Sequence, residues 1–500
     1  MTGTAETRYS GTRSISTQQN GSTYRLRGYD NNRSIETYNM NKGTNYASAT
    51  DFTDNDNYWS AVEYHNTNKD DGALDAHWGA MMTYNYFKNI HSRDSYDNNG
   101  AVIRSYVHYG TNYDNAFWNG LCMTYGDGHT RFDILTSLDV VAHEIGHGVC
   151  TYTANLVYSG ESGAINESFS DIWAACVQNY AAPSKNIWLI GDEIANPPLR
   201  NMSNPQLSSP GQPATYGGGP YWTGPNAGVH TNSGIMNHWF YILSVGKSGT
   251  NGIGNVYNVT GIGISKAEKI AYRAEAVYMT ANTNFANART YTIQAAADLY
   301  GDCSPELVGV TNAWHAVGVG NKFTGTIIIS DTSFNSGTHS ITACTIEISN
   351  TIIEPNTTLK IHGHESVVLK QGFHAQAGSN VRITAGGQTQ GNPNPSYSPP
   401  SNDNIEDTSS MEELAVEFPE IIGVDFAIYP NPNDGNFTLK ITGEVQPYTI
   451  EIFNSIGGLL GYINCQDTIV NIRRADLNTG IYFVKISMSG KIAVKKIIVQ

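Results

Sequence analysis

The chain has 500 residues, more than one hydrophobic core usually spans, so we expect several domains. The formal net charge is -15 and only 15% of the residues are charged. This argues against nucleic acid as a partner, because no basic stripe is present to release counterions. No apolar run approaches the roughly 20 residues of a membrane helix, so no membrane span is expected. The composition suits a soluble extracellular protein.

Residues 1 to about 136 are predicted to form short strands rich in Tyr, Thr and Val, with one helix from about Ala73 to Lys88. The aromatic segment Asn115-Ala116-Phe117-Trp118-Asn119 follows. As an edge strand it could bond the backbone of an extended peptide, although an ordinary buried strand gives the same pattern.

Two histidines four residues apart, His143 and His147, lie in an apolar segment with helical periodicity. On a helix they face the same way, as two zinc ligands must. Glu144 points about 100° round the helix, where it can act on a metal-bound water. The HExxH pattern is typical of zinc proteases but short. Glu167, from a second predicted helix over 164–180, supplies a third ligand and leaves one place for water.

The first helix by itself would also suit two hydrogen-bonded core histidines. Asn166, Glu167 and Asp171, at their spacing from the histidines, favour the zinc site. The rival pattern HExxHxxGxxH fails, because Cys150 and Thr153 stand where its Gly and third His belong. The third ligand is therefore predicted to be glutamate.

Helical periodicity dominates from Leu138 to about 317, with further helices predicted over 234–245, 265–278, 285–300 and 305–317. A strand-rich lobe is thus followed by a helical lobe, with the zinc helix at their junction. Clefts between lobes commonly hold active sites. The six cysteines show no CxxC spacing, which argues against a cysteine zinc site. One disulfide remains an open alternative.

Residues 2 to about 320 resemble the thermolysin-like neutral metalloproteases, the M4 peptidases. The motifs that carry the resemblance are Asn115-Ala116-Phe117-Trp118-Asn119, the His143 helix, and the segments 163–167, 228–234 and 316–319. The resemblance implies an α+β two-lobe catalytic unit, with a β-rich lobe over 1–150 that includes the zinc helix and a helical lobe over 151–322.

The resemblance also implies roles for single residues. His143, His147 and Glu167 would bind one catalytic Zn²⁺, and Asp171 and Asn166 would orient the two histidines. Glu144 would be the general base, while His230 and Tyr158 would donate to the oxyanion. Substrate would contact Asn115, Ala116 and Arg200. A pocket lined by Val140, Ile190 and Leu199 would favour a bulky apolar residue after the cut.

Two departures from the family pattern affect these expectations. Pro225 stands where the family has an Asp that hydrogen-bonds the oxyanion histidine. The family's double calcium site keeps Asp139 and Asp192, with Glu193 adjacent, but Gln178, Ile187 and Leu189 replace other ligands. Calcium needs six to eight oxygens, so we expect fewer calcium ions than in thermolysin.

The remaining chain is predicted to be a β module over 323–385, a flexible linker over 386–422 and a β-sandwich over 423–500. The β module resembles the stacked-strand "coat-hanger" units of Bacteroidetes surface proteins, and could be a stalk, a substrate-binding unit or a spacer. The last segment, with Tyr429-Pro430-Asn431-Pro432 and a terminal Lys495-Lys496-Ile497-Ile498-Val499-Gln500, resembles the sorting domain of the type IX secretion system. A plain β-sandwich binding domain is the alternative.

We therefore expect a secreted, monomeric zinc endopeptidase that meets protein or peptide substrates and the type IX secretion machinery. Two alternatives are kept. One is a surface adhesin on a catalytically impaired protease fold, which Pro225 would support and the intact zinc residues oppose. The other is an exopeptidase that captures a free chain end.

Overall fold

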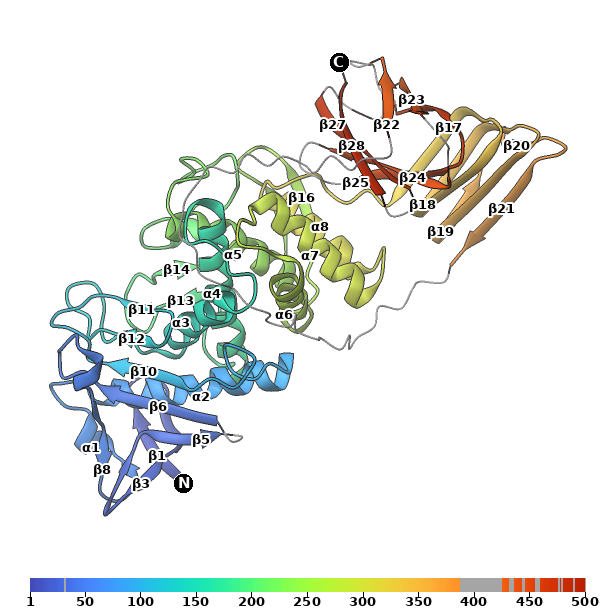
Figure 1. Ribbon diagram of the computed structural model, residues 1–500. Helices are drawn as coiled ribbons and strands as arrows, with labels where there is room; N and C mark the ends of the chain where they lie inside the picture. The colour runs from blue at the N-terminus through green and yellow to red at the C-terminus, as the bar shows by residue number, and fades with distance from the viewer. Residues whose placement is uncertain are drawn as a thin grey trace. The chain divides into compact units, whose positions relative to one another are not determined.

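The computed structural model describes residues 1–30, 33–386, 425–430, 436–442, 446–454, 459–474, 477, 480–488 and 491–499 (Figure 1). The predicted linker 386–422 lies, apart from Gly386, outside this description. The chain divides into two compact units. The first contains Met1–Ala296 and Pro305–Phe323, and the second contains Ala297–Ser304 and Thr324–Gln500.

The first unit begins with strands, as the sequence predicts. Its largest sheet has the order β11-β12-β10-β6-β5, with β7 paired to β6. These strands are β5 (Arg27–Asp30), β6 (Arg33–Asn39), β7 (Thr50–Asp51), β10 (Ile103–Val107), β11 (Ala116–Trp118) and β12 (Met123–Tyr125). Within the described residues β11 pairs only with β12, so it forms an edge of this sheet. This is the position that recognition by strand addition requires.

Two smaller sheets complete the strand-rich lobe. The first has the order β2-β1-β9 and the second β3-β4-β8. Their strands are β1 (Thr2–Thr7), β2 (Gly11–Ser16), β3 (Gln18–Asn20), β4 (Thr23–Arg25), β8 (Thr53–Asp54) and β9 (Tyr58–Trp59). The short helix η1 (Tyr46–Ser48) lies between β6 and β7 in the chain, and the short helix α1 (Ala61–Tyr64) follows β9.

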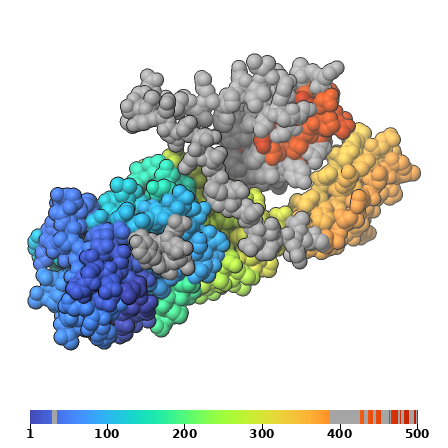
Figure 2. All heavy atoms as spheres, turned by 60° about the horizontal axis from the view of Figure 1, so that its bottom comes forward, coloured from blue at the N-terminus to red at the C-terminus, as the bar shows by residue number. Residues whose placement is uncertain are grey.

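Helix α2 (Asp71–His91) is longer than the predicted span of 73–88 and is buried over most of its length. It contacts β1, β6 and β10 of the strand-rich lobe and also α3 (Leu138–Thr151), so it joins the sheets to the helices. Figure 2 shows the blue N-terminal segments and the cyan and green segments that follow as one continuous surface.

The helical lobe is built around α4 (Gly160–Ala181), which contacts both α3 and α5 (Val229–Val245). Gly146 of α3 allows this close approach, because a Cβ there would lie 3.0 Å from the Cα of Ser170. The lobe continues with α6 (Ile264–Arg273), the π-helical turn η3 (Ala274–Tyr278), α7 (Phe285–Tyr300) and α8 (Pro305–Ala316). The short elements of the lobe are β13 (Leu189–Ile190), β14 (Arg200–Asn201), η2 (Pro205–Leu207), β15 (Gly246–Thr250) and β16 (Val256–Thr260).

In the second unit, residues 326–385 form a stack of parallel strands. The strands are β17 (Thr326–Phe334), β18 (Gly337–Ile353), β19 (Thr357–Leu369), β20 (His374–Ala375) and β21 (Asn380–Ala385). Apolar residues that alternate along them, among them Ile346, Ile348 and Leu359, form one core. A disulfide joins Cys344 of β18 to Cys303 in the segment 297–304, both within this unit. The open question of a disulfide is thus answered, while Cys150 and Cys176 are buried and free.

The C-terminal strands form two antiparallel sheets, with the orders β22-β23-β26 and β25-β24-β27-β28. They are β22 (Asp425–Tyr429), β23 (Asn436–Thr442), β24 (Tyr448–Asn454), β25 (Leu459–Cys465), β26 (Ile469–Arg473), β27 (Gly480–Met488) and β28 (Lys491–Val499). Phe437, Ile450 and Val484 belong to one shared core, as a β-sandwich requires. In the part of the chain that is described, no helix has the length and apolar character needed to cross a membrane.

Candidate metal centre

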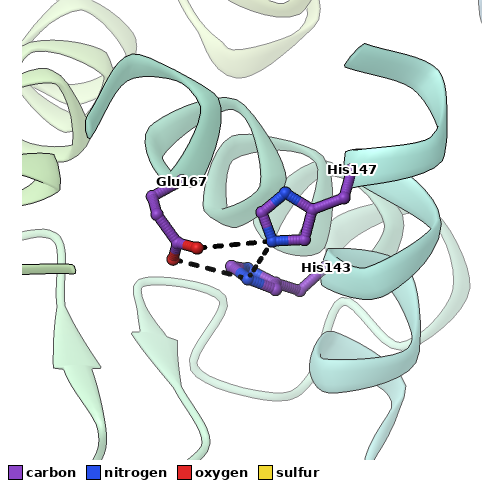
Figure 3. A group of neighbouring side chains, drawn as sticks. All are labelled: His143, His147 and Glu167. Carbon is purple, nitrogen blue, oxygen red and sulfur yellow. Dashed lines mark hydrogen bonds and ion pairs between the residues drawn. The ribbon is translucent and has the colours of Figure 1, made fainter. Parts of the chain in front are cut away.

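Helices α3 and α4 bring three side chains to one point (Figure 3). His143 and His147 lie one turn apart on α3 and point toward Glu167 of α4. Nε2 of His143 lies 3.6 Å from Oε2 of Glu167, and Nε2 of His147 lies 3.4 Å from Oε1. The two Nε2 atoms are 3.1 Å apart. The three ligand atoms all lie within 4.8 Å of one another.

This set of donors fits zinc, which takes imidazole nitrogen and carboxylate oxygen in catalytic sites. Glu167 is fully buried, and its Oε2 accepts no hydrogen bond. Buried carboxylates are costly unless they are paired or bind a metal, so this oxygen is suited to a cation. Burial raises the pKa of Glu167, but His147, His230 and His143 outweigh it and hold the pKa well below its ordinary value. Among the described residues, this is the group of His, Cys, Asp and Glu side chains that could hold a metal ion.

The other ring nitrogen of each histidine is already occupied. Nδ1 of His143 lies 2.9 Å from Oδ1 of Asp171, and Nδ1 of His147 lies 2.7 Å from Oδ1 of Asn166. Because an ionised carboxylate and an amide oxygen only accept, both Nδ1 atoms carry the proton. Both Nε2 lone pairs are therefore directed to the metal position.

Glu144 lies beside the three ligands and lines the same cleft. Its side chain is buried, and burial raises the pKa of its carboxyl above the ordinary value, against the opposing effect of His143 and His147. Such a carboxylate is a better proton acceptor than an exposed one, which is what a general base requires.

The cleft has a volume of about 790 Å³ and follows α3 from Val140 to Thr151. Val140, Ile190 and Leu199, which the resemblance implies for the apolar pocket, are among the residues that line it. Asn115 and Ala116 line it from the edge strand β11 and the residue before it. The elements expected to hold substrate therefore border one cavity.

Tyr158 and His230 lie on the open side of the ligands. The Tyr158 hydroxyl donates to Glu167 and lies 3.2 Å from Nε2 of His230, which is itself 3.3 Å from Oε1 of Glu167. His230 lies in the first turn of α5. The sequence predicted this helix to begin at Gly234, with His230 in the preceding turn, but the helix begins at Val229.

Pro225 stands where the resemblance implies an Asp that hydrogen-bonds the His230 side chain. Two other side chains instead hydrogen-bond the backbone of His230. Nε2 of Gln212 donates to the His230 carbonyl oxygen at 2.6 Å, and the Ser233 hydroxyl donates to it at 3.1 Å. The side chain itself is 66% exposed. The described residues offer no hydrogen bond to its Nδ1, so the ring is fixed less firmly than its backbone.

Arg200 also lines the cleft, but it is buried and paired. Its Nε lies 2.6 Å from Oδ2 of Asp171, which also accepts a 2.7 Å hydrogen bond from Asn237. The predicted contact with a substrate carbonyl can therefore use only the remaining guanidinium donors.

The predicted calcium residues have protein partners of their own. Asp139 accepts from the Ser137 hydroxyl at 2.5 Å and from the Gly191 amide at 2.6 Å. Nζ of Lys185 lies 2.6 Å from Oε2 of Glu193. Asp192 keeps one buried oxygen without a partner, and burial together with Asp139 raises its pKa to about 6. The ammonium of Lys185 thus compensates only part of the negative charge of Asp139, Asp192 and Glu193.

Sequence reasoning missed Gln212 and Asn237, which support the site through contacts with residues distant in the chain. The sequence gives no sign of the role of Gln212, because this residue lies in a stretch without helical or strand periodicity. Asn237 did give one, because a polar side chain stands among apolar residues of a helix that is buried on most sides. Such a residue usually has a specific buried partner.

Comparison with known proteins agrees with this geometry. The family model for the catalytic domain of thermolysin metallopeptidase matches residues 2–151, and that for the alpha-helical domain matches residues 154–319. The chain belongs to the thermolysin metallopeptidase family. Its fold is the expected one, a strand-rich lobe and a helical lobe followed by β structure. A third model, for a secretion system C-terminal sorting domain, matches residues 427–500 and indicates a secreted protein.

Several relatives of this thermolysin-like chain are known. Bacillolysin of Brevibacillus brevis is 44% identical over 317 residues, which are 62% of this chain and 55% of the relative. A thermolysin of Alicyclobacillus acidocaldarius subsp. acidocaldarius is 48% identical over 257 residues, 50% of this chain and 46% of the relative. The chain spans about half the length of these curated relatives. The solved precursor of protealysin, a metalloproteinase from Serratia proteamaculans, is 30% identical with a TM-score of 0.47, over 57% of this chain and 87% of that one.

Proposed function

We propose that the protein is a secreted zinc-dependent neutral endopeptidase. The observation that carries this proposal is the convergence of His143, His147 and Glu167 next to the buried carboxylate of Glu144, inside a cleft bordered by an edge strand. The family match and the names of the relatives support it.

Zinc, when bound, supplies a Lewis acid that polarises a carbonyl and lowers the pKa of a coordinated water to about 7. The chain's residues do the rest. Glu144 accepts the proton of the attacking water, and its raised pKa then allows it to pass that proton to the leaving amine nitrogen. Asp171 and Asn166 keep both histidines in the tautomer that presents Nε2.

Tyr158 and His230 would stabilise the oxyanion that forms when water adds to the substrate carbonyl carbon. Both present a donor on the open side of the three ligands, within 3.2 Å of each other. A donor of this kind is worth on the order of 3 kcal/mol in the transition state. Burial and the neighbouring Glu167 carboxylate raise the pKa of Tyr158, so its hydroxyl keeps its proton at neutral pH.

Substrate would lie as an extended chain along β11. Asn115 and the backbone of Ala116 would hold it, Arg200 would bond a carbonyl oxygen, and Val140, Ile190 and Leu199 would surround the residue after the cut. A bulky apolar residue is favoured there, because burying one is worth about 1.5–3 kcal/mol.

We further propose the boundaries 1–150 and 151–322 for the two catalytic lobes, 323–385 for the β module, 386–422 for the linker and 423–500 for the sorting domain. The family matches lie close to these limits.

The proposed partners are peptide or protein substrates and the type IX secretion machinery, with the protein acting as a monomer. One calcium ion near Asp139 and Asp192 is the most that the site supports.

The decisive experiment compares the wild-type protein with Glu144→Gln. We expect the wild type to hydrolyse casein and Glu144→Gln to lose that activity while it retains one zinc per chain, measured by elemental analysis. A wild-type protein that holds zinc but cuts nothing would instead support the adhesin, for which Pro225 is the one favourable feature. Mass spectrometry of the fragments distinguishes an endopeptidase from an exopeptidase, because cuts inside the substrate chain exclude a pure exopeptidase.

A further inference from the structure

Arg131 places a positive charge at the mouth of the cleft. It lies between β12 and α3, is exposed and lines the cavity. Its guanidinium lies over the ring of Phe132, 4.6 Å from the centroid, and donates to the carbonyl oxygen of Ser209. These contacts hold the charge at the rim while other N–H donors of the planar group remain available.

The neighbours of Arg131 show which end of the cleft it borders. The amide of Asp133 donates to the Ile194 carbonyl at 2.9 Å, and the amide of Ser209 donates to the Leu199 carbonyl at 3.3 Å. Ile194 and Leu199 line the cavity and lie beside Gly191, whose amide donates to Asp139, the residue before Val140 in α3. Trp118 and Thr151 line the opposite end. Arg131 therefore stands beside the apolar pocket and not beside the other half of the cleft.

Asp114 and Arg200, two further charged residues that line the cavity, have partners within the protein. Of the two arginines that line the cavity, Arg200 is buried and pairs with Asp171. Asp114 accepts backbone hydrogen bonds from His129, Arg131 and Phe132, at 3.1, 3.2 and 3.1 Å. No carboxylate of the described residues forms an ion pair with Arg131. The chain has a net charge of -15, yet the exposed guanidinium of Arg131 has no ion-pair partner among the described residues. It can therefore bind a negatively charged ligand.

We propose that Arg131 selects substrates that carry a carboxylate in the two residues following the one held by the apolar pocket. The inference rests on the proposed peptidase function and adds the charge preference of the same cleft. An extended chain advances about 3.3 Å per residue, so these two residues pass the rim as they leave the pocket. The carboxylate can belong to an Asp or Glu side chain or to the end of the chain, because a guanidinium binds either in the same bidentate way.

The test uses internally quenched peptides that are identical except for Asp or Asn at the second or the third residue after the cut. A further pair ends at the second residue, as a free acid or as an amide, and separates the two sources of carboxylate. We expect the wild-type zinc enzyme to cleave at least one of the acidic peptides with a kcat/KM about two- to fivefold higher than its neutral partner, the range of an exposed ion pair. The preference should decrease as salt is added.

Arg131→Gln should abolish this preference, and Arg131→Glu should reverse it. Arg131→Lys keeps the charge and should retain it, which a purely structural role for the Ser209 contact would not predict. Lys247→Gln changes the net charge equally but lies in a separate cavity, so it should leave the preference intact. Equal acid-to-neutral ratios in the wild type and in Arg131→Gln would overturn the inference while the peptidase function stands. If no peptide is cut at all, both proposals fail.

Discussion

Oδ1 of Asp171 lies 2.9 Å from Nδ1 of His143, and the other oxygen of the same carboxylate pairs with Arg200. Asp171 is fully buried, yet Arg200 and His143 outweigh the effect of burial and keep its pKa below the ordinary value. One ionised carboxylate therefore fixes the tautomer of a metal ligand and the position of an arginine in the cleft.

Replacing Asp171 should weaken zinc binding. We expect Asp171→Ala to raise the zinc dissociation constant about 10–100-fold, because the histidine loses the acceptor that orients its ring. The constant can be measured by competition with a chelator of known affinity. Asp97→Ala removes a carboxylate that binds only nearby backbone amides, so it serves as the control. An unchanged zinc affinity in Asp171→Ala would show that packing alone orients His143.

Tyr158 and His230 should contribute unequally to the rate. Tyr158→Phe removes a donor beside Glu167, and we expect a loss in kcat of about 10²-fold. His230→Ala should cost less, about tenfold, because the ring is 66% exposed and the described residues leave its Nδ1 without a hydrogen bond.

Both variants should keep their zinc and change KM little, and steady-state kinetics separates kcat from KM. Tyr152→Phe is the matched control, since this exposed tyrosine lies just beyond α3 and outside the cleft lining. A larger loss for His230→Ala than for Tyr158→Phe would mean that substrate binding orders the histidine.

The spacing of residues along the chain was enough to predict several features of the fold and the site. The histidines of α3 face one way because residues four apart share a helix face, and the edge position of β11 agreed with its aromatic pattern. Glu167 was predicted as the third ligand from its place in the second helix and its spacing from the histidines, whereas the roles of Tyr158 and His230 came from the family resemblance. The sequence could not predict that β17, β18 and β19 run parallel, because the alternation of apolar and polar residues fits parallel and antiparallel strands equally.

Calcium should stabilise the wild-type protein only weakly. Lys185 already lies against Glu193, and hydrogen bonds from Ser137 and Gly191 satisfy Asp139. Removing the ammonium in Lys185→Gln leaves more negative charge for a cation to compensate. We therefore expect added calcium to raise the Tm of Lys185→Gln by about 2–4 °C more than that of the wild type.

Differential scanning calorimetry with millimolar CaCl₂ or with EGTA measures this difference, with zinc present throughout. Lys266→Gln also removes a lysine that forms an ion pair with a glutamate, Glu306, and controls for a general loss of charge. A large calcium effect on the wild type would show that Lys185 gives way to the ion.

His108 should make stability depend on pH in a direction opposite to His77. The imidazole of His108 lies between two carboxylates, with Nδ1 2.5 Å from Asp127 and Nε2 3.1 Å from Asp70. Burial works against its charge, but the two carboxylates outweigh burial and raise its pKa. His77 is buried between the Thr37 hydroxyl and the Ser16 carbonyl, and burial lowers its pKa to about 4.

The sign of each contribution follows from linkage. An unfolded histidine titrates near pH 6.5. The stabilisation from His108 is complete below that pH and is lost as the pH rises through its raised folded pKa. The stabilisation from His77 is complete above pH 6.5 and is lost as the pH falls toward 4. His108→Gln should therefore lower the Tm of the first unit most at pH 5.5, and His77→Gln most at pH 8.5. Because both variants remove one imidazole from the same lobe, a shared trend with pH would contradict the charge state assigned to His108.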